Sequence, residues 1–327
     1  MSAPPLARLS VRYQQSGDFP DGALAQLSFG DHVTYADARC LRVPLQPIGD
    51  SSLHECWEVE ARTTHGEHGP LRWSAGGGWL FIALELHEAA FDGIEAAAEH
   101  AYRRLCEFVA AREERHLLRI WNYLHAINEG AGDGERYRRF CIGRARGLAA
   151  HGIERYPAAT AIGHGASGLL QIYALCASQP GVALENPRQI SAWRYPREYG
   201  PTPPSFARAM KLPGDGLAIS GTAAVVGHAS CHERDLEAQI SETCANLYAL
   251  LESAALPALD RRSPLKIYLR HAEDTPALQA ALAKHLDPEV PRVILLGDIC
   301  RRELLVEIDG WSGLPRSPTA GGSPRAG

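Results

Sequence analysis

The sequence lacks the features that direct a chain to a membrane or to nucleic acid. No apolar run approaches the roughly 18 residues of a membrane span, and residues Met1 to Pro5 carry neither the basic nor the apolar region of a signal peptide. A formal net charge of −5 argues against nucleic acid or an anionic membrane as a general partner, because both require a basic surface. We therefore expect a cytoplasmic protein that acts on a small molecule.

Paired cysteines and metal-binding motifs are also missing. The eight cysteines include no C-x-x-C pair, and a chain of 327 residues with 45% apolar content can bury a core without disulfides, so we expect reduced thiols. His228 and His232 are four residues apart, but the helix expected from Glu233 begins too late to place both on one face. We expect no bound metal.

One glycine-rich motif could be mistaken for a cofactor site. Residues 163–168 read Gly-His-Gly-Ala-Ser-Gly and match the dinucleotide pattern G-x-G-x-x-G. The residues that follow are β-like and then rich in proline, where a dinucleotide site needs a crossover helix. We interpret the motif as a loop between two strands and expect no cofactor.

Helix and strand patterns occur twice in the same order. Residues 1–60 suggest strands and loops, after which each copy runs helix, strand, helix, strand, strand. The first copy comprises 93–115, 117–124, 134–150, 158–162 and 169–175, and the second 233–254, 265–270, 275–285, 292–297 and 304–308. This order predicts an internal duplication and an α+β fold with mixed sheets backed by helices.

The segment between the copies is rich in arginine, proline and aromatic residues. We expect an N-terminal domain over 1–180, a connecting segment over 181–216, a C-terminal domain over 217–311 and a disordered tail over 312–327. A plain linker would carry fewer large rings, so the connecting segment is a candidate for lining a site that binds a flat anion.

The stretch from Gly297 to Asp309 contains the candidate acid. Alternation would place Leu305, Glu307 and Asp309 on one face of a strand, with Leu304, Val306 and Ile308 on the other. If the strand is central, desolvation would raise the pKa of Glu307 and leave it able to donate a proton near neutrality. On an edge strand the same residue would simply face solvent, and the pattern alone favours neither.

The sequence resembles two groups of proteins, one broad and one specific. The C-terminal copy, with Leu304-Leu305-Val306-Glu307-Ile308, resembles the YjgF/RidA superfamily, which implies two RidA-like or chorismate-mutase-like units in one chain. Nearly the whole chain resembles the chorismatases, with matches at 119–123, 135–140, 186–189, 191–196, 205–209, 219–223 and 300–307.

The chorismatase resemblance implies a substrate and a chemistry. Chorismate has two carboxylates, for which planar guanidinium groups are suited; the resemblance suggests Arg144, Arg194 and Arg208, with Tyr123, Tyr195 and Thr222 beside them. Glu307 would protonate the enolpyruvyl group, giving pyruvate without a metal or an organic cofactor. Cys300 favours formation of 3-hydroxybenzoate, whereas Ala223, where glycine is expected, is compatible with additional 4-hydroxybenzoate.

Three other interpretations stay open at this point. The enzyme could be a chorismate hydrolase that gives a dihydroxycyclohexadiene carboxylate and pyruvate. It could instead be a RidA-like imine deaminase with Arg292 in its cleft, or a binding protein for an aromatic acid in which Glu307 is structural. A monomer and a homotrimer are both compatible with a duplicated chain.

Overall fold

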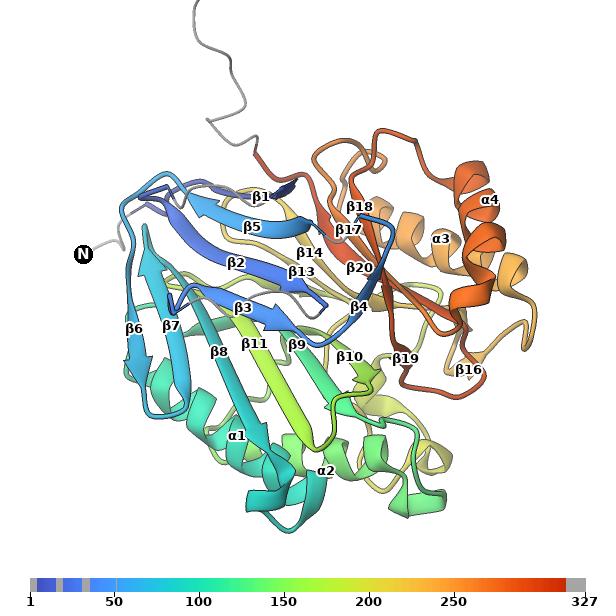
Figure 1. The fold of residues 1–327 in the computed structure, drawn as a ribbon, viewed down its shortest axis with the longest axis horizontal. Coiled ribbons are helices and arrows are strands. Elements are labelled where there is room, and N and C mark those ends of the chain that lie inside the picture. Colours follow the sequence, from blue (N-terminus) through green and yellow to red (C-terminus); the bar gives the residue numbers. More distant parts are fainter. Residues whose placement is uncertain (1–4, 16–19, 31–35, 51, 316–327) are drawn as a thin grey trace, which may run out of the picture.

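The computed structural model describes residues 5–15, 20–30, 36–50 and 52–315, and it contains two similar sheet-and-helix units side by side with a smaller sheet packed across them (Figure 1). The first unit has seven strands in the order β19-β10-β9-β11-β8-β7-β6. Its strands are β6 (Thr64–His68), β7 (Leu71–Gly76), β8 (Trp79–His87), β9 (His116–His125), β10 (Ala158–His164), β11 (Leu169–Ala177) and β19 (Asp298–Ile299), and its helices are α1 (Gly93–Ala110) and α2 (Arg136–Ala149).

The second unit is also a seven-stranded sheet with two helices, and its strand order is β12-β13-β14-β20-β17-β18-β4. Its strands are β4 (Gln46–Ile48), β12 (Val182–Leu184), β13 (Ala209–Lys211), β14 (Leu217–Thr222), β17 (Leu265–Leu269), β18 (Arg292–Leu296) and β20 (Val306–Ser312), and its helices are α3 (Leu236–Ser253) and α4 (Thr275–His285).

The remaining elements form a four-stranded sheet, a short hairpin and single 3-10 turns. The four-stranded sheet has the order β1-β5-β2-β3. These elements are β1 (Leu9–Gln15), β2 (Ala23–Phe29), β3 (Cys40–Val43), β5 (Leu53–Val59), β15 (Val225–Val226), β16 (Ala229–Ser230), η1 (Glu88–Ala90), η2 (Gly132–Gly134), η3 (Ala192–Arg194), η4 (Arg197–Tyr199) and η5 (Ala272–Asp274).

The two large units repeat one topology. The first runs β8-α1-β9-α2-β10-β11 and the second β14-α3-β17-α4-β18-β20. In both, the two strands that flank the second helix pair in parallel, and the last strand inserts antiparallel between the first two. The predicted α+β class and the two-unit organisation are therefore confirmed.

The sheets exchange edge strands, so the predicted boundaries at 180 and 217 do not separate them. β4, from the N-terminal part, pairs with β18, and β19, from the C-terminal part, pairs with β10. The connecting segment 181–216 supplies β12 and β13 to the second sheet. These edge strands are two or three residues long, too short for a periodic hydrophobic pattern to reveal them.

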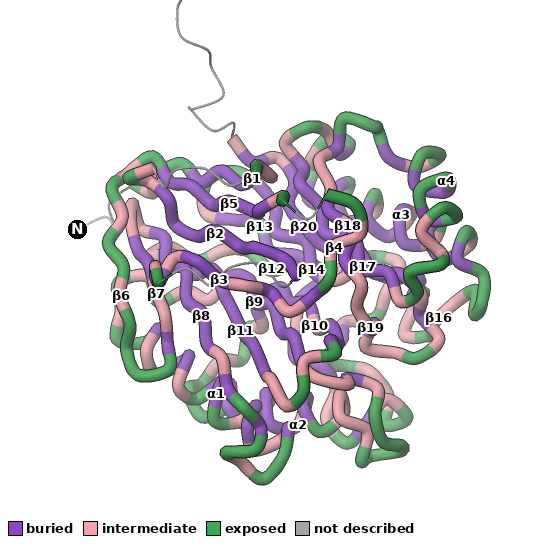
Figure 2. The backbone as a smooth tube through the Cα atoms, in the orientation of Figure 1, coloured by how far each residue is buried: buried purple, intermediate pink, exposed green. Residues whose placement is uncertain are grey.

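Three apolar layers hold the units together. The four-stranded sheet packs across both large sheets over a core that includes Trp57, Trp121 and Trp311, while α1 and α2 cover the far face of the first sheet and α3 and α4 that of the second. The central strands of both sheets are buried along their length (Figure 2). Among the described residues, no helix is long and apolar enough to cross a membrane.

Some predicted element boundaries need correction. α1 ends at Ala110, not at 115, because no apolar residue follows Val109 on its buried face before Leu117. The disordered tail predicted from Ser312 is incorrect for residues 312–315, since β20 continues through Ser312 and the Leu314 side chain is buried in the core. Residues 316–327 lie outside the described part of the chain.

Candidate active site

A cavity of about 380 Å³ lies where the two units meet. Its wall combines residues of α2 and β10 from the first unit with residues of β14 and of the segment 300–307 from the second, and the connecting segment closes one side. Six of the predicted site residues line it, namely Glu307, Cys300, Arg144, Arg208, Tyr195 and Ala223. The sequence thus brings together side chains that are far apart along the chain.

Three predicted site residues are not part of this wall. Arg194 is exposed on η3. Tyr123 is fully buried in the core, with its hydroxyl 3.0 Å from that of Tyr268, and the buried Thr222 hydroxyl donates to the Ser220 carbonyl at 2.9 Å. For Thr222 this follows from alternation along the chain, because the neighbouring residues Gly221 and Ala223 line the cavity instead. Tyr123 belongs to β9, none of whose residues lines the cavity.

Glu307 lies on β20, between β14 and β17. Its neighbours Val306 and Ile308 pack in the core under α3 and α4, whereas Glu307 points to the opposite face and is 5% exposed. Of the two positions that the sequence leaves open, a central and an edge strand, the structure has the central one. The alternation begins only at Val306, however, because 300–305 forms no strand, and Leu305 packs with the α3 and α4 core instead of beside Glu307.

The carboxyl group of Glu307 makes no hydrogen bond to any described residue. Burial, reinforced by the nearby Asp309 carboxylate, raises the pKa of Glu307 from its ordinary 4.5 to about 8, against the opposing effect of Arg119, Arg208 and Arg270. The group therefore carries its proton at neutral pH while it faces the cavity. It is free to deliver that proton to a bound molecule.

Space for this carboxyl group is provided by Gly221. Gly221 lies on β14, the strand beside β20, and a Cβ atom there would overlap Oε1 of Glu307. The clash would involve the reactive end of the acid, which cannot move away without leaving its place in the cavity wall. A residue without a side chain is consequently required at this position.

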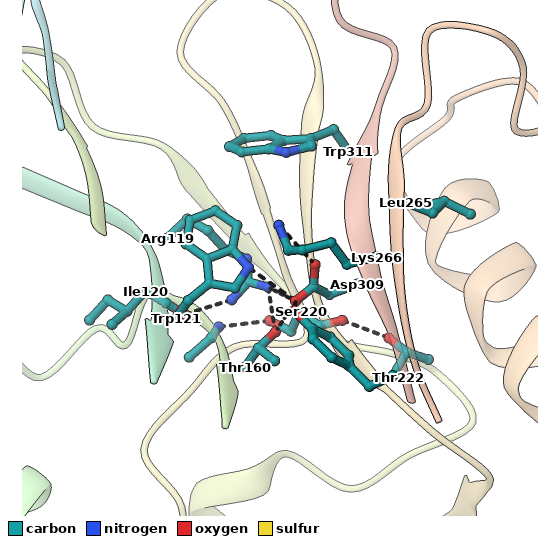
Figure 3. Close-up of polar contacts among 12 residues, drawn as sticks. Arg119, Ile120, Trp121, Thr160, Ser220, Thr222, Leu265, Lys266, Asp309 and Trp311 are labelled. Atoms are coloured by element: carbon teal, nitrogen blue, oxygen red, sulfur yellow. Dashed lines mark hydrogen bonds and ion pairs between the residues drawn. The ribbon is translucent and has the colours of Figure 1, made fainter. Parts of the chain in front are cut away.

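Asp309, two residues after Glu307 on β20, belongs to a network of buried charges. Figure 3 shows Asp309 with Arg119, Thr160 and Lys266 of this network. Asp309 is at its centre, and its Oδ2 atom accepts from Trp121 Nε1 (3.0 Å), Thr160 Oγ1 (2.7 Å) and the Tyr268 hydroxyl (2.9 Å) and lies 3.2 Å from Arg119. Lys266 Nζ lies 2.6 Å from Glu55 and 3.6 Å from the other oxygen of Asp309. Two cations balance two carboxylates, so the network itself is neutral and offers no unpaired cation to an ionised Glu307.

Two buried arginines in the cavity have no carboxylate partner within ion-pair distance among the described residues. Arg144 is 3% exposed and donates only to the Ser205 carbonyl, and its Nε has no acceptor. Arg208 is 6% exposed, donates to the Ile190 carbonyl and the Tyr195 hydroxyl, and likewise has an unpaired Nε. A buried cation without a counter-ion is costly, so both side chains are suited to receive anionic groups of a ligand.

Cys300 is a neutral thiol at the cavity wall. Burial, and to a lesser extent the charge of Glu307, raises the pKa of its thiol far above the ordinary value. It cannot serve as a thiolate nucleophile at neutral pH. Ala223 lies on the same wall, and its small side chain packs in the apolar cluster that Cys300 also contacts.

The turn of the glycine-rich motif and the two histidines are placed as predicted. Residues 165–168 form the turn between β10 and β11, and both His228 and His232 precede α3. Among the described residues, no group of three or more His, Cys, Asp or Glu side chains is placed to hold a metal ion. The eight cysteines, all within the described ranges, are free.

Sequence reasoning missed Thr160, Gly221 and the network around Asp309. A signal did exist for the network: Arg119 and Lys266 are charged residues inside otherwise apolar strands, and a buried cation calls for a buried partner. Gly221 had no comparable signal, because a need for empty space is visible only when the neighbouring strand is in place.

Comparisons with known proteins agree with one another. Residues 55–176 match the family model described as "Chorismatase FkbO/Hyg5-like, N-terminal". A 3-hydroxybenzoate synthase of Streptomyces hygroscopicus is 34% identical over 78% of this chain and 80% of its own length, and a chorismatase of Streptomyces rapamycinicus is 35% identical over 80% and 82%. A crystal structure of a chorismatase superposes with a TM-score of 0.85 and 28% identity, covering 94% of this chain and 99% of the other.

Proposed function

Because the chain belongs to the chorismatase family, we propose that it converts chorismate into pyruvate and 3-hydroxybenzoate, with Glu307 as the general acid. The observation that carries the proposal is a protonated, unbonded carboxyl group that shares one cavity with two unpaired arginines. An acid-labile enol ether with two carboxylates has the chemistry that this arrangement fits.

The two carboxylates of chorismate bind to Arg144 and Arg208. Each guanidinium still has a free N–H, and a substrate carboxylate would supply the ion-pair partner that neither arginine has among the described residues. The Tyr195 hydroxyl, already hydrogen-bonded to Arg208, fixes the orientation of that arginine. Binding therefore sets the enolpyruvyl group against Glu307.

The reaction begins with transfer of the Glu307 proton to the terminal methylene carbon of the enolpyruvyl group. This step forms a C–H bond and leaves an oxocarbenium ion at the ether carbon, which the new Glu307 carboxylate stabilises electrostatically. The ring hydroxyl then attacks the ring carbon that carries the ether oxygen and breaks that carbon–oxygen bond, which releases pyruvate and leaves a protonated arene oxide on the ring. The arene oxide opens at its other carbon–oxygen bond. Loss of a ring proton, which returns to Glu307, gives the aromatic product with no net consumption of water.

Cys300 and Ala223, which line the same wall of the cavity, determine which product forms. A neutral thiol beside the ring excludes water from the intermediate and favours 3-hydroxybenzoate over the diene diol that hydrolysis would give. The methyl group of Ala223 narrows the same wall, and we expect a minor fraction of 4-hydroxybenzoate from an altered position of the ring.

The test is incubation of the purified protein with chorismate, followed by chromatography for pyruvate, the diene diol and both hydroxybenzoates. Stoichiometric pyruvate and 3-hydroxybenzoate support the proposal. Glu307→Gln should lower kcat by about 10²- to 10⁴-fold, the range for loss of a general acid, while Glu237→Gln, an exposed carboxyl on α3, serves as the control. Folded protein that leaves chorismate intact would refute the proposal.

A further inference from the structure

Arg270 makes an unusually complete set of hydrogen bonds next to the cavity. It follows the last residue of β17, and its guanidinium donates through all three nitrogens. The acceptors are the carbonyls of Leu304 (2.8 Å), Ile299 (2.9 Å) and Arg301 (2.9 Å) and the side chains of Asp298 (2.7 Å) and Asn128 (3.0 Å). These five bonds use every donor that an arginine side chain has.

Four of the five acceptors belong to the segment 298–304, which supplies much of the cavity wall. Cys300 and the four residues after it line the cavity, and the segment leads directly into β20 and Glu307. β19 fixes the beginning of the segment by pairing with β10 of the first unit. No strand pairs with residues 300–305 among the described elements, so side chains take the place of a ladder. Arg270 binds three carbonyls of the segment, and Gln239 binds the Glu303 carbonyl and the Leu305 amide.

The positive charge of Arg270 does not assist the proposed reaction. Its side chain is 10% exposed, and burial lowers its pKa, which shows that the cation is held at a cost. Its positive charge also favours the ionised form of Glu307, which opposes proton donation. The benefit of a buried guanidinium here must therefore come from its five fixed donors, a geometry that no other side chain reproduces.

We propose that Arg270 is a positioning residue that holds the segment 298–304 as one wall of the active site and thereby sets the product ratio. The proposal rests on the proposed chorismatase function for its kinetic consequence. A loosened segment would move Cys300 away from the ring and admit water to the intermediate. The substrate carboxylates would still bind, because Arg144 and Arg208 belong to other elements.

The kinetic test compares Arg270→Lys with Arg270→Gln. We expect both to lower kcat by about 100-fold, the effect of a displacement near 1 Å in an active site, with KM within about threefold of the unmodified enzyme. Both should raise the share of diene diol. Lysine retains the charge but not the fork of donors, so near-normal kcat and product ratio in Arg270→Lys would overturn the proposal.

A milder variant guards against loss of folding. Asp298 is 46% exposed, so Asp298→Asn removes the negative charge of one acceptor and weakens its hydrogen bond to Arg270 without disturbing the core. We expect a smaller fall in kcat, about three- to tenfold, with the same shift toward the diol. Arg262→Gln is the matched control, since Arg262 bonds only to Asp260 in a surface turn and should leave both quantities unchanged.

Hydrogen exchange tests the clamp independently of the reaction. Backbone amides of 299–305 should exchange at least tenfold faster in Asp298→Asn and in either Arg270 variant, while amides of α1 keep their protection. Unchanged exchange in this segment would refute the clamp even if the enzyme is active. Faster exchange in a protein that never consumes chorismate would uphold the clamp and refute the chorismatase function.

Discussion

Because Glu307 stays protonated in the folded protein, the free energy of unfolding should decrease as the pH rises. In the unfolded chain the group ionises near 4.5, whereas the fold raises its pKa to about 8. Below the unfolded value both states hold the proton, and the fold suffers no penalty. Between the two values only the unfolded chain releases it, so the free energy of unfolding falls, by about 3 to 4 kcal/mol from pH 5 to pH 8.

Glu307→Gln separates this contribution from all other titrations. The amide resembles the protonated acid in shape and cannot ionise, so the variant should gain about 3 to 4 kcal/mol relative to the unmodified protein over the same pH interval. Urea unfolding of both proteins at several pH values measures the difference, and Glu237→Gln is the control for an exposed carboxyl. A difference that does not change with pH would refute a raised pKa at Glu307.

Four further outcomes follow from the geometry of the cavity. The kcat should be level through neutrality and fall tenfold per pH unit above about 8, as Glu307 loses its proton, which a pH–rate profile measures. Gly221→Ala should lower kcat at least tenfold and destabilise the fold by about 1 to 3 kcal/mol through overpacking, seen by kinetics and thermal unfolding. Arg144→Gln or Arg208→Gln should raise KM about 10- to 100-fold, which corresponds to the loss of one charge-assisted hydrogen bond to the substrate. Steady-state kinetics measures this change. Cys300→Ala should keep pyruvate release but raise the diol share, and an unchanged product ratio on chromatography would remove the thiol from the proposed branch point.

The repeated pattern of helices and strands made most of the fold predictable. α4 begins and ends where its pattern indicates, and α3 begins three residues late because Asp235 caps it by accepting from the Ala238 amide at 3.0 Å. The edge strands could not be found in the same way. Their two or three residues carry no periodicity, and their partners are set by how the units dock.

Site residues could be predicted where their type is unusual for their surroundings in the sequence. They could not be predicted where their role depends on the three-dimensional arrangement. Glu307 was a candidate because it is a carboxylate in an apolar stretch, and the segment of Arg208 because it is rich in arginine and aromatic residues, whereas Arg144 was suggested by the chorismatase resemblance. Tyr123 looked equally suitable as a substrate contact but faces the core on β9. No sequence pattern pointed to Arg270, because its proposed positioning role depends on hydrogen bonds to carbonyls of a segment about 30 residues further along the chain.

The exchange of edge strands has a consequence for biosynthesis. β4 is synthesised well before its partner β18, and the edge of the first sheet stays open until β19 has been synthesised. Neither sheet can be completed before β18 to β20 have left the ribosome, and contacts so distant in sequence form slowly. A nascent chain would thus hold open sheet edges until then, and the Cys300 segment, which follows β19, would take its place only after most strands of both units have been synthesised.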